Sequence, residues 1–117
     1  MKIMLVDDSK TARNKIKTVL AGDGVEVVEF ADGQDALAGF SAHQPDWVFM
    51  DLEMKEVDGF EATRQIKARF PDARIVILTS FNDEFLKAAA LEAGACGYVL
   101  KDDVLSIRNL VKEGLSS

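Results

Sequence analysis

The 117-residue sequence predicts an α/β domain, in which a doubly wound, five-stranded parallel sheet is covered by five helices on its two faces. Strand-like and helix-like segments alternate along the whole chain, which is typical of parallel strands joined by helical crossovers. Short apolar runs, such as Ile3 to Val6 and Trp47 to Met50, have the composition of strands buried on both faces. Polar residues close these runs, so a ligand site is expected at the carboxyl ends of the strands.

Five segments have the length and apolar content of strands. They are expected at Lys2 to Val6, Val25 to Phe30, Trp47 to Met50, Arg74 to Leu78 and Gly97 to Leu100. The second segment alternates valine with glutamate, which predicts a strand more exposed than its neighbours.

Five helices are expected between and after these strands. They are Ser9 to Ala21, Gly33 to Ala42, Gly59 to about Arg69, Asp83 to Ala93 and Val104 to Leu115. Asp8 or Ser9 is suited to cap the first helix, and Asn82 the fourth. Glycines at 22 and 24 are expected to end the first helix, and Gly94 the fourth.

The composition indicates one domain, residues 1–117, with 48% hydrophobic residues and a net charge of −6. No apolar stretch approaches the roughly 20 residues of a membrane span, and a signal-peptide pattern is lacking, so a cytoplasmic location is expected. The negative charge argues against direct nucleic-acid binding, and Arg13, Lys15 and Lys17 are interpreted as a solvated helix face. The single cysteine, Cys96, lies among small residues and is expected to be a buried filler.

Charged and hydroxyl residues follow four of the predicted strands. Asp7 and Asp8 close the first, Asp51 the third, Thr79 the fourth and Lys101 the fifth. Three carboxylates at one sheet edge would repel one another, so a cation is needed to offset them. With a hydroxyl and an ammonium group facing them, these carboxylates indicate a site for a metal ion and a phosphoryl group.

In these residues the sequence resembles the receiver domain of bacterial two-component response regulators, a CheY-like domain. The resemblance covers essentially the whole chain and is most like receivers of the NarL/FixJ subfamily, which often carry a helix-turn-helix output domain. Its motifs are Asp7-Asp8, Met50-Asp51-Leu52, Asp58-Gly59, Thr79-Ser80 and the run from Gly97 to Lys101. It implies a flavodoxin-like fold with sheet order 2-1-3-4-5.

The resemblance also implies a phosphoacceptor that receives its phosphoryl group from a sensor histidine kinase or a phosphotransfer protein. Asp51 matches the acceptor, which reacts only while ionised. Asp8 and Asp51 would ligate Mg²⁺ directly, Asp7 through water, and Glu53 through its main-chain carbonyl. Oxygen ligands without histidine or cysteine suit Mg²⁺.

Three further residues match the phosphate-binding and switching positions of the family. Lys101 would pair with one phosphoryl oxygen, and the Thr79 hydroxyl would bond to another. Tyr98 matches the aromatic residue that turns inward behind the threonine and remodels the surface of the fourth helix, fifth strand and fifth helix. Glu53 and Phe81 flank the path of a hydrolytic water, so we expect both to affect the lifetime of the phosphorylated state.

The sequence departs from the family at two positions. Lys55 stands where a proline often follows the acceptor, and Asp102 stands where a proline often follows the lysine, which leaves open whether the Lys101–Asp102 bond is cis. The only histidine, His43, lies in an expected loop and is interpreted as a surface residue. The phosphoryl donor must then be another molecule.

Other functions are possible on such a sheet. An aspartate-nucleophile phosphatase would also use carboxylates and Mg²⁺, but no insertion is long enough for a substrate cap. A flavin- or nucleotide-binding module would need a glycine-rich loop after the first strand, which is absent. We therefore expect no enzyme activity beyond self-catalysed phosphorylation and dephosphorylation. The expected partners are a kinase and either a downstream protein or an output domain outside this chain, with homodimerisation possible and no membrane contact.

Overall fold

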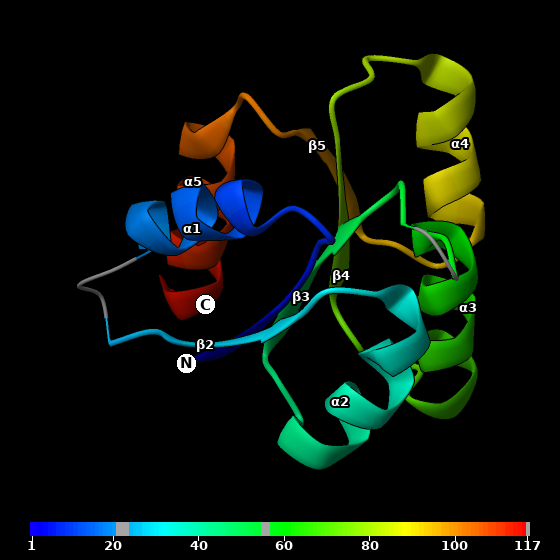
Figure 1. The fold of residues 1–117 in the computed structure, drawn as a ribbon, viewed down its shortest axis with the longest axis horizontal. Helices are drawn as coiled ribbons and strands as arrows, with labels where there is room; N and C mark the ends of the chain where they lie inside the picture. The colour runs from blue at the N-terminus through cyan, green and yellow to red at the C-terminus, as the bar shows by residue number, and fades with distance from the viewer. Residues whose placement is uncertain (21–23, 55–56, 117) are drawn as a thin grey trace.

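The computed structural model describes residues 1–20, 24–54 and 57–116. It contains one five-stranded parallel sheet in the order β2-β1-β3-β4-β5, which confirms the predicted fold and strand order (Figure 1). The strands are β1 Lys2–Val6, β2 Glu26–Phe30, β3 Trp47–Asp51, β4 Ile75–Thr79 and β5 Gly97–Leu100.

In the described part of the chain, five α-helices cover the sheet. They are α1 Lys10–Leu20, α2 Ala36–His43, α3 Gly59–Arg69, α4 Glu84–Glu92 and α5 Val104–Ser116. A short 3₁₀ turn, η1 Gly33–Asp35, precedes α2 and takes up the start of the helix that was predicted as one piece. In Figure 1, α1 and α5 lie on one face of the sheet and α2, α3 and α4 on the other.

The core is divided by the sheet into two apolar layers because successive strand side chains point to opposite faces. The layer under α2 and α3 includes Met4, Val6, Val48, Met50, Ala62 and Ile66. The layer under α1 and α5 includes Ile3, Leu5, Ile16, Phe49, Ile107 and Val111. Central strands β1, β3 and β4 are buried almost throughout, whereas β2 is only partly buried, as its sequence predicted.

The register of the strands aligns their carboxyl ends. Val6 of β1 pairs with Met50 of β3, which in turn pairs with Ile77 of β4. Asp7, Asp51 and Thr79 therefore emerge at the same edge of the sheet.

The helix ends differ from the predictions in one detail. Asp83, not Asn82, caps α4, because its carboxylate accepts hydrogen bonds from the N–H groups of Phe85 and Leu86 at 2.8 and 3.1 Å. Ser9 caps α1 by accepting from the Ala12 N–H at 3.2 Å. Gly94 adopts a φ of 108° after α4, as expected of a helix-ending glycine. The predicted end of α1 at residues 21–23 lies outside the described residues.

The expectation for Cys96 was wrong, because its side chain is exposed. The residue lies just before β5, where its N–H donates to the Ile75 carbonyl at 2.8 Å. The neighbouring Ala95 fills the core in its place. None of the helices in the described part of the chain has the length and apolar content needed to cross a membrane.

Candidate functional site

The centre of the candidate site is an ammonium group shared by two buried carboxylates. The Lys101 Nζ atom lies 3.0 Å from Asp7 Oδ2 and 3.0 Å from Asp51 Oδ1. Asp7 is fully buried and Asp51 is 3% exposed. Lys101 follows β5 directly, and its N–H donates to the Thr79 carbonyl at 2.8 Å, which fixes the lysine backbone beside β4. The structure thus brings together side chains from the ends of β1, β3 and β5.

Three carboxylates at this edge could hold a metal ion. One oxygen from each of Asp7, Asp8 and Asp51 lies within 4.8 Å of the other two. Asp8 is exposed to solvent, so the group is open on one side. The Asp7 carboxylate is held in place by the Ser9 N–H, which donates to Oδ1 at 2.8 Å. A donor set made only of oxygens fits a hard cation such as Mg²⁺ or Ca²⁺ better than zinc or copper.

Burial and the neighbouring charges shift two pKa values in the site. Burial raises the pKa of Asp51 from 3.8 to about 6, with Asp7 adding to the rise and Lys101 opposing it. Burial lowers the pKa of Lys101, but its hydrogen bonds to Asp51 and Asp7 outweigh this, and the net pKa is raised. Lys101 therefore stays cationic at neutral pH. The ionised form of Asp51 is destabilised by burial, and a second cation beside it would offset this destabilisation.

A polar pocket of about 260 Å³ opens beside these groups. Its lining residues are Asp8, Asp51, Glu53, Thr79, Ser80, Phe81 and Lys101. Thr79 is buried, and its hydroxyl oxygen accepts a hydrogen bond from the Phe81 N–H at 3.2 Å. Glu53 and Phe81 lie at the exposed rim, so both border the space from which water or a phosphoryl group enters.

The Tyr98 side chain lies half-buried beside the loop between β4 and α4. Its hydroxyl donates to the Phe81 carbonyl, and burial raises its pKa. Thr79 and Tyr98 therefore bond to the N–H and the carbonyl of one residue, Phe81.

Arg13 supports the site from α1, a contact that the sequence analysis missed. Its guanidinium donates from Nη1 to the Asp7 carbonyl and from Nε to Glu29 at 3.1 Å. Lys17 also donates to Glu29 at 2.9 Å, and this bond lowers the Glu29 pKa more than the Arg13 bond does. Arg13 is thus part of a chain of contacts from β2 to the end of β1, rather than a member of a solvated helix face.

Of the two family departures, only the one at Asp102 lies within the described residues. No peptide bond among the described residues is cis, so the Lys101–Asp102 bond is trans. Lys55 lies outside the described residues. His43 is half-buried at the end of α2, with its ring centroid 6.1 Å from that of Phe30, and it does not line the polar pocket.

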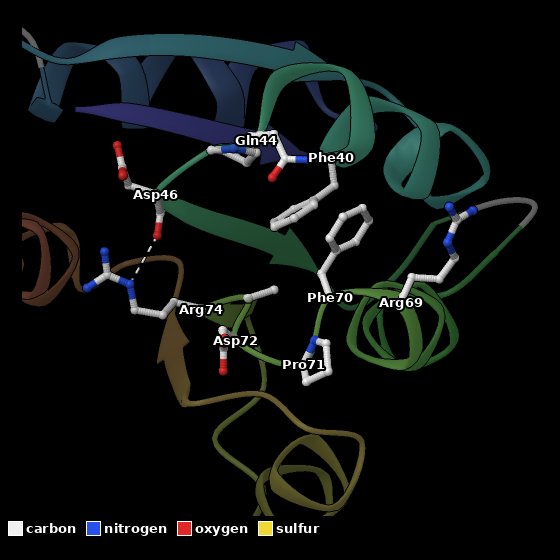
Figure 2. Close-up of a pocket in the computed structure, with 10 residues that line it drawn as sticks. Phe40, Gln44, Asp46, Arg69, Phe70, Pro71, Asp72 and Arg74 are labelled. Carbon is white, nitrogen blue, oxygen red and sulfur yellow. Dashed lines mark hydrogen bonds between the residues drawn. The ribbon is translucent and has the colours of Figure 1, made fainter.

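A second hollow, of about 330 Å³, lies at the opposite end of β3 and β4. Figure 2 shows the Phe40 and Phe70 rings facing each other there, with their centroids 4.8 Å apart. The Arg74 Nε donates to the Asp46 carbonyl at 3.1 Å beside them. The three-carboxylate cluster and its lysine are at the other edge of the sheet, so this hollow is not part of the candidate site.

The chain belongs to the response regulator receiver domain family, which it matches over residues 3–112. Receiver domains of this class are the phosphoacceptor modules of two-component signal transduction.

Among curated proteins, the chain is similar to the uncharacterized transcriptional regulatory protein YhcZ of Bacillus subtilis, with 42% identity over 87% of this chain and 49% of that protein. It is also similar to the response regulator protein VraR of Staphylococcus aureus, with 40% identity over 86% of this chain and 49% of that protein. The chain spans about half the length of these curated relatives.

Solved structures agree with this assignment. A two-component response regulator of the LuxR family from Aurantimonas has a TM-score of 0.90 and 36% identity, covering 98% of this chain and 84% of that one. The chemotaxis protein CheY4 of Vibrio cholerae has a TM-score of 0.88 and 26% identity, covering 96% of each chain. The CheY-like fold predicted from the sequence is therefore confirmed.

Proposed function

We propose that Asp51 is the residue of this receiver that accepts the phosphoryl group, in a reaction that requires Mg²⁺. The observation that carries the proposal is the position of the Lys101 ammonium, 3.0 Å from the carboxylates of both Asp51 and Asp7. An aspartate with a cation at one oxygen and a polar pocket beside it is suited to attack phosphorus. The buried Asp7 has no comparable access, and Asp8 lacks the lysine contact.

In the proposed reaction, one Asp51 oxygen attacks the phosphorus of a phosphohistidine on a donor protein. A P–O bond to Asp51 forms, the P–N bond to the donor breaks, and the donor imidazole keeps that electron pair. The Lys101 ammonium pairs with a phosphoryl oxygen, and the Thr79 hydroxyl donates to another. Because Asp51 must be ionised to attack, its raised pKa predicts that a smaller fraction of the metal-free protein carries a reactive carboxylate as the pH falls through about 6.

The metal expected at the carboxylates is Mg²⁺. Asp8 and Asp51 would hold it directly, with Asp7 acting through water and the Glu53 carbonyl completing the protein ligands. When bound, Mg²⁺ supplies positive charge at the reacting oxygens. It would also offset the repulsion among the three carboxylates and lower the pKa of Asp51.

Thr79 and Tyr98 are the proposed switch residues, and the output surface is formed by α4, β5 and α5. The proposal is supported by their shared bonds to Phe81, since a movement of the Thr79 hydroxyl toward a phosphoryl group would disturb the loop that also holds Tyr98. The new charge thus biases a loop with two arrangements.

Glu53 and Phe81 are proposed to set how long the phosphoryl group stays on Asp51. Both border the polar pocket, and the Phe81 side chain is 50% exposed at its mouth. A bulky apolar ring there would hinder the hydrolytic water. Phe81→Ala should speed dephosphorylation, measured by the decay of the phosphoprotein in intact-mass spectra, and an unchanged rate would show that the ring has no such role.

The proposal extends to the biological setting. The phosphoryl donor would be a sensor histidine kinase or a phosphotransfer protein. The phosphorylated domain would act on a downstream protein or on an output domain outside this chain. Phosphorylation could also favour a homodimer. We place the domain in the cytoplasm and assign it no activity on other substrates, only its own phosphorylation and dephosphorylation.

Acetyl phosphate provides the experiment that tests the proposal. Incubated with acetyl phosphate and Mg²⁺, the protein should gain the mass of one phosphoryl group, and it should gain none in excess EDTA. Asp51→Asn should remain unmodified, whereas Asp72→Asn, a change at an exposed aspartate far along the chain, should behave as the original protein. Phosphorylation of the Asp51→Asn protein at the original rate would refute the assignment.

A further inference from the structure

We infer that a groove between α3 and α4 is a docking site for a cationic amphipathic helix of a partner protein, and that Phe81 couples its affinity to the state of Asp51. The coupling to Asp51 rests on the proposed function, whereas the docking site itself does not. The groove has a volume of about 410 Å³ and lies beside the polar pocket. Its lining residues are Leu52, Glu53, Met54, Asp58, Phe60, Phe81 and Leu86.

The floor of the groove is apolar and continuous with the core. Leu52 belongs to the buried layer under α2 and α3, and Met54, Phe60 and Leu86 pack against that layer while staying half-exposed. Phe60 lies in the first turn of α3 and Leu86 in the first turn of α4, so the groove is lined from the N-terminal ends of both helices. In Figure 1, α4 lies above α3 along the right of the view. A large apolar side chain from a partner would displace water from this floor.

The rim of the groove is acidic. Two of its described lining residues, Glu53 and Asp58, are acidic and exposed, and none of the described lining residues is basic. Asp83 and Glu84, which precede Leu86 at the N-terminal end of α4, are also exposed. With a net charge of −6 on the whole chain, this rim favours a partner with lysine or arginine beside its apolar residues. A helix with an apolar stripe between basic flanks meets both requirements, in the mode of helix-in-groove recognition.

Phe81 connects the groove to the phosphorylation site. Its side chain lines both the groove and the polar pocket, and it is 50% exposed. Its N–H donates to the Thr79 hydroxyl at 3.2 Å and its carbonyl accepts from Tyr98. When the Thr79 hydroxyl turns to a phosphoryl oxygen, the Phe81 N–H either loses its hydrogen bond to that hydroxyl or moves with it. The wall of the groove then changes shape, and the affinity for its occupant changes with it.

A fluorescein-labelled helical peptide of leucine and lysine, patterned to form one apolar stripe, is the probe. Its binding to the whole chain is measured by fluorescence polarisation, in EDTA and again with Mg²⁺ and beryllofluoride as the phosphoryl mimic. A peptide with the same lysines and serine in place of leucine is the control for charge. The serine peptide should bind at least about tenfold more weakly, because the apolar contact is then missing.

Two variants test the groove, and a control variant on α4 is matched to the one at Leu86. Leu86→Gln on α4 and Met54→Gln in the opposite wall should each weaken binding of the leucine peptide about tenfold. Phe85→Gln removes a side chain that is 89% exposed and does not line the groove, and it should change the affinity less than about twofold. Circular dichroism of each variant shows that it is folded, and Met54→Gln serves if Leu86→Gln unfolds.

The coupling has its own readout. Beryllofluoride should change the affinity of the peptide about fivefold or more, and Thr79→Ala should reduce that change to less than about twofold. Equal affinity for the leucine and serine peptides, or wild-type affinity in both groove variants, would overturn the docking site. Self-association of the chain that Leu86→Gln abolishes would show a second copy as the occupant and also overturn it.

Failure of the proposed function is distinguished by intact mass with acetyl phosphate. If the phosphoryl group is taken up but the affinity of the peptide stays the same, the coupling is refuted and the proposed function stands. If no phosphoryl group is taken up while the peptide binds as predicted in EDTA, the proposed function fails and the docking site stands.

Discussion

Replacing Asp51 by asparagine should stabilise the metal-free protein at pH 7. Asp51 is buried, and its pKa is raised from 3.8 to about 6, chiefly by burial. The folded state thus binds the proton more tightly than the unfolded state does, so the stability that this group contributes is greatest below its unfolded pKa and falls as the pH rises toward about 6. A shift of this size corresponds to a cost of about 3 kcal/mol at pH 7. Asparagine carries no charge and removes that cost.

The pH dependence of the difference sharpens this prediction. At pH 5 only part of the cost remains, so the stability gap between Asp51→Asn and the original protein should narrow from about 3 to about 1.5 kcal/mol. The two proteins are compared by urea unfolding followed by circular dichroism, in EDTA at both pH values. Asp72→Asn, at an exposed position, is the control for loss of one negative charge and should change stability by less than about 0.5 kcal/mol.

Mg²⁺ provides a second check on the same variant. The cation should stabilise the original protein and leave Asp51→Asn much less affected, so the gap should narrow again at pH 7. An Asp51→Asn protein that is no more stable than the original in EDTA at pH 7 would refute the reasoning, since the ionised carboxylate would then cost nothing in the folded state.

Two further substitutions test the frame of the site. Arg13→Ala removes the donor to the Asp7 carbonyl and should cost about 1–2 kcal/mol in urea unfolding, with weaker Mg²⁺ binding by calorimetry; unaltered values of both would show that the contact is unimportant. Gly59→Ala places a Cβ atom 2.3 Å from the Asp51 carbonyl oxygen and should cost about 1–3 kcal/mol, whereas Gly97→Ala, whose nearest neighbour is 3.4 Å away, should cost less than about 0.5 kcal/mol. Equal stability of the two glycine variants would contradict this close approach.

The main features of the site could be anticipated because parallel strands impose a common direction. Asp7, Asp51, Thr79 and Lys101 each follow a predicted strand, and strands that run in the same direction end at the same edge. The sequence pattern alone therefore placed these residues together, without any knowledge of side-chain conformation. The prediction of the strand order had another basis, because it came from the family resemblance and not from the sequence pattern.

Contacts that depend on how helices and loops pack could not be anticipated. Arg13 reads as a solvated helix residue until α1 is laid beside β2, where it meets Glu29 and the Asp7 carbonyl. Cys96 has small neighbours, but only the turn before β5 decides that it faces solvent. The joint contact of Thr79 and Tyr98 with Phe81 depends on the path of one loop, which no periodicity reports.

The chemical trapping of the acyl phosphate tests the central claim most directly. After acetyl phosphate and Mg²⁺, borohydride reduces an aspartyl phosphate to homoserine, which peptide sequencing by mass spectrometry can locate. We predict homoserine at position 51, and only when acetyl phosphate and Mg²⁺ are both present before the reduction. Homoserine at position 7 or 8, or none anywhere in a protein that has gained a phosphoryl group, would contradict the assignment of Asp51.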